Sequence, residues 1–290
     1  MKNILLIKKK YVYLAAVLVM FIIGIFAYLL LAKNNKNPTG AVSLEPVSGE
    51  EIYPLFLCAC CGQPLDKNNI CCGMAEEMIN YIDSLVNAGL SKNEIIIKTA
   101  EKYGINSIIE PKRAEIEAEL AKRNPNLFPA EKLSFNQALG KKAPEFSLEG
   151  IDGKTVKLND YKGKYVVLFF NEGSMCYPAC WNQMAELGND ERFNTNNVAA
   201  FSIVVDQKSE WERIVKRVPQ LSKAKILFDA VRSVSSAYDV LSLPSSMHPG
   251  SYPGHTYFII DKEGIVRYTL DDKNMAVWND KLASEIEKLS

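Results

Sequence analysis

The first apolar segment of the chain is long enough to cross a membrane. Tyr11 to Ala32 has no charged side chain over 22 residues, and a helix of that length spans a hydrocarbon core of about 30 Å. A signal peptide has a shorter apolar core of about 7–15 residues and a small-x-small cleavage site, and residues 30–32 (Leu-Leu-Ala) do not form one. The segment therefore predicts an uncleaved transmembrane anchor.

Lysines predict the orientation of this anchor. More of them precede the apolar segment than follow it: Lys2, Lys8, Lys9 and Lys10 lie before it, and Lys33 and Lys36 after it. The positive-inside bias then places the N-terminus in the cytoplasm and the rest of the chain outside, where disulfides persist. We expect a single-pass protein of the cell membrane, and a polar stalk to Glu51 follows the anchor.

Two helices and a charged third segment come next. Apolar residues of 75–87 recur with a helical period and form one face: Met78, Ile79, Ile82, Leu85 and Val86. Gly89 ends this helix, and Ser91 with Glu94 three residues later forms a capping box for a second helix that runs to Tyr103. The charged segment 111–123 predicts a third helix, which acts as a spacer.

From Gly140 the pattern changes to strands that alternate with helices. Two runs, 164–170 and 198–205, are continuously apolar, as are strands buried on both faces of an α/β sheet. Asp152-Gly153 and residues 261–264 predict hairpin turns. The remaining predicted strands are 154–158, 225–228 (a short edge strand), 256–260 and 265–270, and the predicted helices are 178–187, 209–218 (capped by Ser209) and 275–289.

The net charge gives no sign of binding to polyanions, and the grouping of the cysteines indicates a sulfur-based function. The 34 basic and 34 acidic residues balance, so nothing predicts attraction to nucleic acid or to an anionic surface. All seven cysteines lie in two places: five between Cys58 and Cys72, and two at Cys176 and Cys180. Close groups of cysteines indicate redox chemistry or metal binding.

Cys176 and Cys180 lie where a central strand turns into a helix. A helix N-terminus carries partial positive charge and unpaired amide hydrogens, which favour the nucleophilic thiolate over the thiol. Cys180, one turn further on, is close enough to attack a mixed disulfide formed at Cys176. A static structural disulfide is the alternative, although an i, i+4 pair at an exposed corner would stabilise little.

The motifs of the C-terminal half resemble those of the redoxin (AhpC/TSA, TlpA/ResA-like) superfamily. The order strand–helix–strand–helix, then a hairpin and a helix, is the thioredoxin arrangement, so the resemblance implies a thioredoxin-like α/β fold over residues 139–290. It also implies a thiol-based enzyme. The matching stretches are 142–148 (KAPEFSL), 152–164 (DGKTVKLNDYKGK), 166–170 (VVLFF), 180–187 (CWNQMAEL) and 256–264 (TYFIIDKEG).

The site departs from both family patterns. Thioredoxins have two residues between the cysteines, whereas here there are three, and Cys180 matches the second family cysteine. Peroxiredoxins carry Pro-x-x-x-Thr/Ser-x-x-Cys. When this pattern is aligned on Cys176, Phe169 stands at the proline position and Gly173 at the Thr/Ser position. His255 stands where peroxiredoxins have an arginine and thioredoxins a cis-proline. With a pKa expected near neutrality, His255 is a candidate acid–base or thiolate-stabilising residue, or else a loop histidine that only packs.

Two further residues near these motifs have uncertain roles. His248 lies in the Pro- and Gly-rich stretch 244–254, which has the composition of a shaped substrate loop, and it is more simply explained as an ordinary loop residue. Trp181 follows Cys180 directly and belongs either to a docking surface or to the cover of the core.

The N-terminal cysteine cluster resembles the CcmH-type domain of cytochrome c maturation. Residues 52–110 share the family's Cys-x-x-Cys at Cys58 and Cys61, a nearby glutamine, the Gly-x-Ser-x-x-Glu-Ile pattern at 89–95 and the Tyr-Gly close at 103–104. The sequence adds Cys60, Cys71 and Cys72 to the family's pair. The domain is predicted to be a small cysteine-rich helical unit.

The chemistry of this cluster has two interpretations. Either Cys58 and Cys61 exchange disulfides, with the other cysteines adjusting the potential, or four thiolates (Cys58, Cys61, Cys71 and Cys72) hold Zn²⁺ or a copper ion. A set of purely structural disulfides would leave one of the five cysteines unpaired. No Cys-x-x-Cys-His occurs, so covalent haem attachment is not expected.

The sequence therefore predicts a membrane-anchored extracytoplasmic thiol–disulfide oxidoreductase that uses Cys176, Cys180 and His255. The alternatives are a thiol peroxidase, or a metal-binding or cytochrome c assembly module that uses the N-terminal cysteines. No cofactor is required by the main reading, and the expected partners are the membrane and a thiol/disulfide donor or acceptor protein. The predicted segments are 1–33 (anchor), 34–51 (stalk), 52–110 (cysteine-rich domain), 111–138 (helical linker) and 139–290 (redoxin domain).

Overall fold

The computed structural model describes residues 47–58 and 61–289. The predicted anchor Tyr11–Ala32 and most of the predicted stalk lie outside these residues. Among the residues described, the helices are all too short or too polar to cross a membrane. At the end of the predicted stalk, Gly49–Glu51 forms a 3-10 helix that is capped by Ser48 and whose Gly49 is buried.

The cysteine-rich part is built on helices α2 (Gly73–Asn87) and α3 (Lys92–Tyr103), with α4 (Lys112–Arg123) after them. Short 3-10 helices at Tyr53–Leu55 and Ile105–Ser107 complete it. The hydroxyl of Ser91 accepts a hydrogen bond from the Glu94 backbone N–H, as the capping box predicted. Its core lies between these helices and consists of apolar residues that include Phe56, Met78, Ile79, Ile82, Ile95, Ile96 and Ile116.

The C-terminal half contains one mixed sheet of seven strands in the order β2-β1-β5-β4-β3-β6-β7. The central strands β3, β4 and β5 run parallel, and β6 pairs antiparallel with β3. The strands are β1 (Ser147–Gly150), β2 (Thr155–Lys157), β3 (Tyr165–Phe170), β4 (Val198–Val204), β5 (Ile226–Phe228), β6 (Thr256–Ile260) and β7 (Val266–Asp271). This is the thioredoxin-like α/β fold that the sequence predicted.

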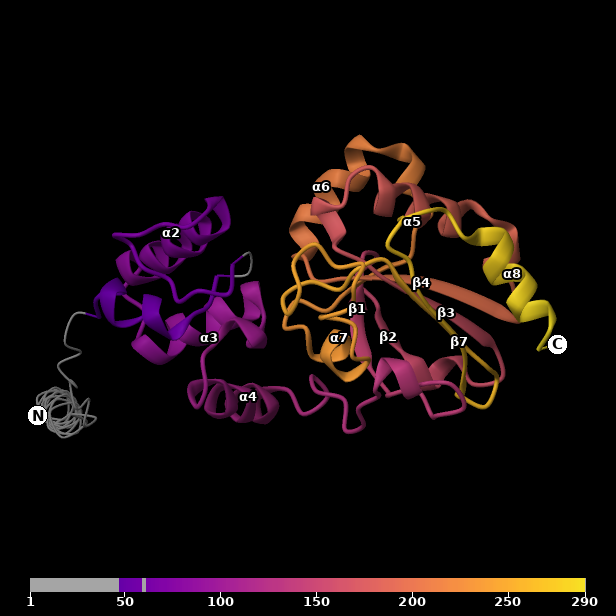
Figure 1. Ribbon diagram of the computed structural model, residues 1–290, viewed down its shortest axis with the longest axis horizontal. Helices are drawn as coiled ribbons and strands as arrows, with labels where there is room; N and C mark the ends of the chain where they lie inside the picture. The colour runs from indigo at the N-terminus through magenta and orange to yellow at the C-terminus, as the bar shows by residue number, and fades with distance from the viewer. Residues whose placement is uncertain (1–46, 59–60, 290) are drawn as a thin grey trace, which may run out of the picture. The chain divides into compact units, whose positions relative to one another are not determined.

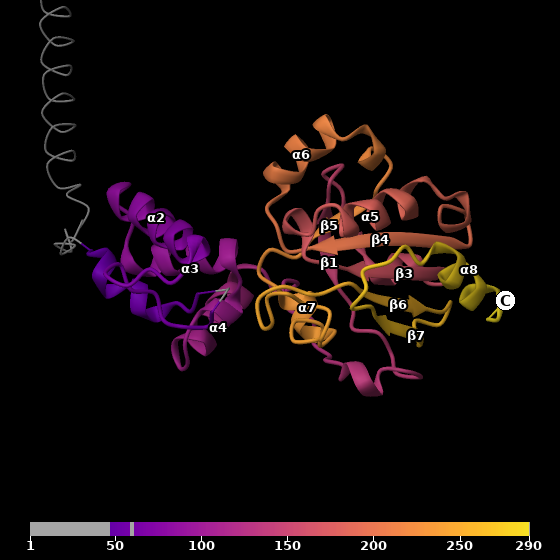
Figure 2. The ribbon, with the colours of Figure 1, turned by 45° about the horizontal axis from the view of Figure 1, so that its top comes forward.

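Helices cover both faces of this sheet (Figure 1). Figure 2 shows α5 (Ala179–Asn189) and α6 (Lys208–Arg217) over one face and α7 (Ser233–Ala237) near the other. The helix α8 (Asn279–Glu287) packs on the first face, because its Leu282, Ala283 and Ile286 share a core with α5 and α6. Alternate residues of β3 divide between the two cores, so Phe169 faces α5 while Phe170 faces α7.

Two local predictions were wrong. Residues 226–228 were expected at the sheet edge, but the β1–β2 hairpin pairs with β5 and places it inside the sheet, where all three residues are buried. Helix α6 begins at Lys208, and its N-cap is Gln207 rather than Ser209. A short apolar run and a lone serine cannot by themselves indicate which neighbour covers a strand or where a helix starts.

Candidate redox site

Cys176 and Cys180 lie at the carboxyl end of β3. After Phe170 the chain turns through a 3-10 helix, Gly173–Met175, and Cys176 comes directly after it. Two residues later α5 begins at Ala179. The backbone N–H of Cys180 donates to the carbonyl of Cys176 at 3.0 Å, which brings the two side chains together. The predicted pair is joined by a disulfide between the two sulfurs.

Both cysteines are buried. Cys180 is fully buried, whereas Cys176 keeps 3% of its surface exposed. The sequence predicted that the helix start would activate Cys176. In the structure Cys176 lies in the turn before α5, and Cys180 lies in the first turn of the helix. The sulfur of Cys176 instead contacts the Met275 sulfur at 3.9 Å.

His255 faces the buried sulfur. It precedes β6, and its Nδ1 lies 3.6 Å from the Sγ of Cys180. Its Nε2 lies 3.1 Å from the carbonyl oxygen of Ala276 and 2.7 Å from the hydroxyl of Tyr257. A carbonyl only accepts hydrogen bonds, so we assign the proton to Nε2. The Nδ1 lone pair is then directed at the Cys180 sulfur.

The ring of His255 is neutral at physiological pH. Its side chain is fully buried, and it packs edge-on against Phe169 with 4.6 Å between ring centroids. Burial lowers the pKa of His255 to about 4, although the Ala276 carbonyl and the Asp272 carboxylate act in the opposite direction. The sequence expectation of a pKa near neutrality is therefore corrected. A neutral imidazole with a bare Nδ1 can accept a proton, which a protonated one cannot.

Asp206, at the end of β4, holds the loop in front of Cys176 and was not singled out in the sequence. Its carboxylate accepts hydrogen bonds from the Ser174 N–H at 2.9 Å, the Ser174 hydroxyl at 3.1 Å and the Trp211 indole N–H at 2.6 Å. Burial raises the pKa of Asp206 to about 6, although the bonds from Trp211 and Ser174 oppose that rise. Its place directly after an apolar strand was the available sequence signal.

Gly173 is required by this arrangement. It has a φ of +65°, and an added Cβ would lie 1.8 Å from the Asp206 Oδ2. Trp181 fastens the same loop, since its indole N–H donates to the Gly173 carbonyl at 3.1 Å. The Trp181 ring also lies between Tyr177 and Trp211, with centroids 5.0 and 5.7 Å away. Trp181 is thus a brace for the cysteine loop.

A second loop, residues 244–254, is fastened by Glu172. This glutamate is fully buried, and its Oε1 accepts from the backbone N–H groups of Met247 at 2.5 Å and His248 at 3.2 Å. His248 Nδ1 lies 3.5 Å from the other carboxylate oxygen, so His248 belongs to this loop anchor. An added Cβ at Gly254 would lie 2.0 Å from the Ser245 hydroxyl, which explains glycine directly before His255.

The N-terminal cysteines form a separate group. Cys58 is buried and Cys61 and Cys71 are exposed, and the sulfurs of these three lie within 4.8 Å of one another. The sulfur of Cys72 lies 3.4 Å from that of Cys58. The predicted ligand or redox set is thus brought together, while Cys60 lies outside the described residues.

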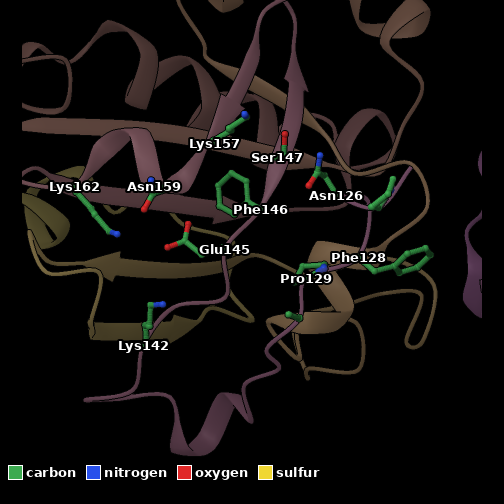
Figure 3. A pocket seen from close by; sticks show the side chains of 12 residues that line it. Asn126, Phe128, Pro129, Lys142, Glu145, Phe146, Ser147, Lys157, Asn159 and Lys162 are labelled. Carbon is green, nitrogen blue, oxygen red and sulfur yellow. The ribbon is translucent and has the colours of Figure 1, made fainter. Parts of the chain in front are cut away.

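A cavity between residues 125–130 and the start of the sheet is lined mainly by polar and charged residues in place of cysteines (Figure 3). Its lining includes Lys142, Lys157, Lys162 and Glu145, and none of its lining residues is a cysteine or a histidine. It therefore offers no sulfur chemistry, and the disulfide with His255 remains the candidate active site.

Comparison with known proteins bears on the half that carries this site. Residues 139–269 match the family model described as "AhpC/TSA family". Peroxiredoxin Bcp of Bacillus subtilis is 32% identical over 131 residues, which cover 43% of this chain and 80% of that protein. The chain belongs to the AhpC/TSA family. It is thus a thiol-based enzyme, with oxidoreductase or peroxidase chemistry.

Other relatives and solved structures are also similar to this chain. Peroxiredoxin-2 of Cricetulus griseus is 34% identical over 142 residues, covering 46% of this chain and 69% of that protein. A Plasmodium vivax 2-Cys peroxiredoxin in its reduced state is 25% identical, covers 53% of this chain and 82% of that chain, and has a TM-score of 0.46. A putative protein disulfide isomerase from Bacteroides thetaiotaomicron is 18% identical, covers 52% and 88%, and has a TM-score of 0.41.

Proposed function

We propose that this AhpC/TSA-family protein is a thiol–disulfide oxidoreductase that acts on disulfides of partner proteins outside the cytoplasm, held there by a single N-terminal membrane anchor. The anchor and the compartment follow from the apolar segment 11–32 and its flanking lysines. The assignment of the reaction depends on one observation: Nδ1 of His255 lies 3.6 Å from the sulfur of Cys180, the cysteine that has no access to solvent.

In the reduced protein, the thiolate of Cys176 attacks a sulfur of the partner's disulfide. A Cys176–partner mixed disulfide forms, and the partner's other sulfur leaves as a thiolate. Cys180 then attacks the Cys176 sulfur, and its proton passes by way of His255 Nδ1 to the partner sulfur that leaves. The Cys176–Cys180 disulfide forms, the second partner sulfur leaves, and the partner has gained two electrons. An external dithiol reduces the disulfide again.

Apolar side chains around the disulfide support a protein substrate. Four of the large exposed apolar residues belong to segments that contact the site: Met175, Tyr177, Met247 and Val277. Met175 and Tyr177 flank Cys176, Met247 is held by Glu172, and Val277 follows the carbonyl that orients His255. Exposed apolar groups on the segments that flank a reactive cysteine suit a polypeptide better than a peroxide, which has no apolar surface to bury.

The second candidate is a thiol peroxidase, and the names of the relatives favour it. Cys176 would attack a peroxide oxygen to give a sulfenic acid and water or an alcohol, and Cys180 would condense with the sulfenic acid and release water. Against it, Phe169 and Gly173 replace the Pro and Thr/Ser that the peroxiredoxin pattern places before its cysteine, and His255 replaces the arginine. The neutral His255 offers no positive charge to a peroxide anion or a thiolate.

Stopped-flow oxidation of the reduced full chain distinguishes the two. We expect a model protein disulfide to oxidise Cys176 rapidly, and hydrogen peroxide to react with it no faster than with an ordinary thiol. Cys180→Ser should accumulate a mixed disulfide with the protein substrate, whereas Cys176→Ser should form none. If peroxide oxidises Cys176 faster than the protein disulfide does, the peroxidase is the correct function.

The role of His255 has its own test. His255→Asn should slow the decay of the mixed disulfide by about 100-fold or more, since general acid–base groups contribute roughly 10²–10⁴-fold, and should leave its formation unchanged. The matched control is His248→Asn, because the chain has 2 histidines and His248 does not touch the disulfide. Equal slowing of formation and decay would show that His255 only supports the fold.

A further inference from the structure

Two segments bring four cysteine sulfurs together in the cysteine-rich part. Cys58 and Cys61 come from a tight turn, and Cys71 and Cys72 come from the residues that lead into α2. The sulfurs of Cys61 and Cys71 are 2.8 Å apart, those of Cys58 and Cys72 are 3.4 Å apart, and those of Cys71 and Cys72 are 3.9 Å apart. Each segment thus supplies two sulfurs: those of Cys58, Cys61 and Cys71 lie within 4.8 Å of one another, and that of Cys72 adjoins Cys58 and Cys71.

The backbone fixes the first pair. The N–H of Cys58 donates to the carbonyl of Gln63 at 2.8 Å, and the N–H of Gly62 donates to the carbonyl of Cys58 at 2.8 Å. Gly62 has a φ of +67°, which closes the turn directly after Cys61. The two residues between Cys58 and Cys61 give a spacing that lets both side chains reach the same ion.

The second pair is set by the start of α2. Cys72 is the N-cap residue of this helix. This position leaves Cys72 partly exposed. Neighbouring Cys71 is exposed and lines an open cavity with Gln63, Asp66 and Asn69, so the sulfurs have a route to solvent.

The sulfur separations can be compared with two kinds of bonding. Zn–S bonds of about 2.3 Å in a tetrahedron put the sulfurs about 3.8 Å apart, whereas a disulfide needs about 2.05 Å. The separations of 3.4 and 3.9 Å lie near the tetrahedral value, and the pair at 2.8 Å would have to open by about 1 Å. Four sulfur ligands with this geometry select zinc among the divalent ions.

We propose that Cys58, Cys61, Cys71 and Cys72 form a tetrathiolate site that binds Zn²⁺. On binding, each sulfur still protonated releases its proton to solvent, and no oxidant or reductant takes part. The ion joins the turn that carries Cys58 and Cys61 to the start of α2, and so closes this end of the cysteine-rich core. The exposed positions of Cys61 and Cys71 make the ion exchangeable.

The test is zinc content of the full chain, purified under reducing, oxygen-free conditions. We expect one zinc ion per chain by elemental mass spectrometry, and a cobalt-substituted protein with the absorption bands of tetrahedral thiolate coordination. The double variant Cys61→Ser/Cys71→Ser should hold almost no zinc. Cys60→Ser, which removes the fifth cysteine of the 58–72 segment but none of the four proposed ligands, should keep it, as should Cys176→Ser/Cys180→Ser.

Loss of the fold must be separated from loss of a ligand. The Cys61→Ser/Cys71→Ser variant is therefore checked for oxidation of Cys176, which requires the C-terminal half to be folded. The proposal is overturned if the reduced wild-type chain binds no zinc, if it takes up Cu⁺ but not Zn²⁺, or if the double variant retains zinc. It stands or falls separately from the function proposed for Cys176, because zinc content does not depend on that sulfur.

Discussion

The two cysteine sites of this chain differ in the burial of their cysteines and in what surrounds the sulfurs. Cys176 and Cys180 lie in an apolar core between β3 and α5, and together they form a disulfide in which one sulfur has no exposed surface. Cys61 and Cys71 lie on the surface, and Cys72 is the N-cap residue of α2. A buried pair of cysteines beside a single histidine suits two-electron disulfide exchange. Exposed cysteines beside further thiols suit the binding of a metal ion.

The comparison shows that cysteine spacing alone does not define chemistry. Cys-x-x-Cys is the spacing usually linked to disulfide exchange, yet here it belongs to the site in which the sulfurs of Cys58, Cys61 and Cys71 lie within 4.8 Å of one another. The wider Cys-x₃-Cys spacing carries the disulfide. What differs is the partner each site offers: His255 at the disulfide, and two further thiols at the cluster.

Replacing the cysteines by serines should have the largest effect on turnover and zinc content. These variants test directly whether the two cysteine sites have different functions. Cys176→Ser should lower turnover of a protein disulfide by at least about 10³-fold, because the attacking atom is gone, and should leave zinc content unchanged. Cys61→Ser/Cys71→Ser should do the reverse. Turnover and elemental analysis on the same preparations check both. If either variant abolished both properties, the two sites would not be independent.

Gly173→Ala should destabilise the loop before Cys176 by about 4 kcal/mol. The left-handed φ of +65° costs about 1–2 kcal/mol for alanine, and the added Cβ would displace the Asp206 carboxylate, leaving buried groups without partners at about 1–3 kcal/mol. Gly163→Ala is the control, since Gly163 has a φ of +83° and open space around it. Urea unfolding should show a loss at least about twice that of the control; equal losses would remove the proposed role of Asp206.

Asp206→Asn tests the same loop through pH. The pKa of Asp206 rises from 3.8 to about 6 on folding, so the folded state binds this proton more tightly than the unfolded state. The resulting stability is present below pH 3.8 and is lost as the pH rises through 6. Asparagine does not titrate, and its amide can accept from Trp211 and donate to the Ser174 hydroxyl.

The variant should therefore gain stability relative to the wild type by up to about 3 kcal/mol between pH 4 and pH 7. Unfolding midpoints of both proteins across this range, compared as a difference, cancel the other titrating groups. Asp229→Asn does not serve as a control, because the pKa of Asp229 is also raised by burial. A constant difference across the range would mean that Asp206 is already ionised at low pH.

The sequence predicted the framework well because the framework depends on local patterns. The apolar runs that became β3 and β4 end within a residue or two of the predicted limits, and Ser91 caps α3 as expected. The pairing of Cys176 with Cys180 followed from their separation of about one helical turn. Such signals need no knowledge of distant segments.

The remaining features depend on contacts between residues far apart in sequence. Asp206 acts on Ser174, which precedes it by 32 positions, so no local pattern could identify it. The pKa of His255 falls to about 4 because several elements bury it, while a sequence shows only an ordinary histidine. The interior position of β5 depends on the β1–β2 hairpin, which lies about 70 residues earlier in the chain.

The smallest expected effect concerns the surface beside the disulfide. Tyr177 is 71% exposed and follows Cys176, so a polypeptide that docks on the sulfur would cover it. Tyr177→Ser should raise KM for a protein disulfide about tenfold, which corresponds to about 1.4 kcal/mol of lost contact, with kcat nearly unchanged. The matched control is Ile70→Ser, which removes an exposed apolar residue (46%) beside the cysteine cluster and should change neither constant.

The same variant distinguishes the substrates, because a peroxide is too small to reach Tyr177 while it reacts at Cys176. The rate of reaction with hydrogen peroxide should therefore be equal in Tyr177→Ser and in the wild type. If KM for the protein disulfide did not change either, the apolar residues around Cys176 would have no part in binding. The site would then be distinguished from the cysteine cluster only by its buried sulfur and by His255, and a protein substrate would lose its main structural support.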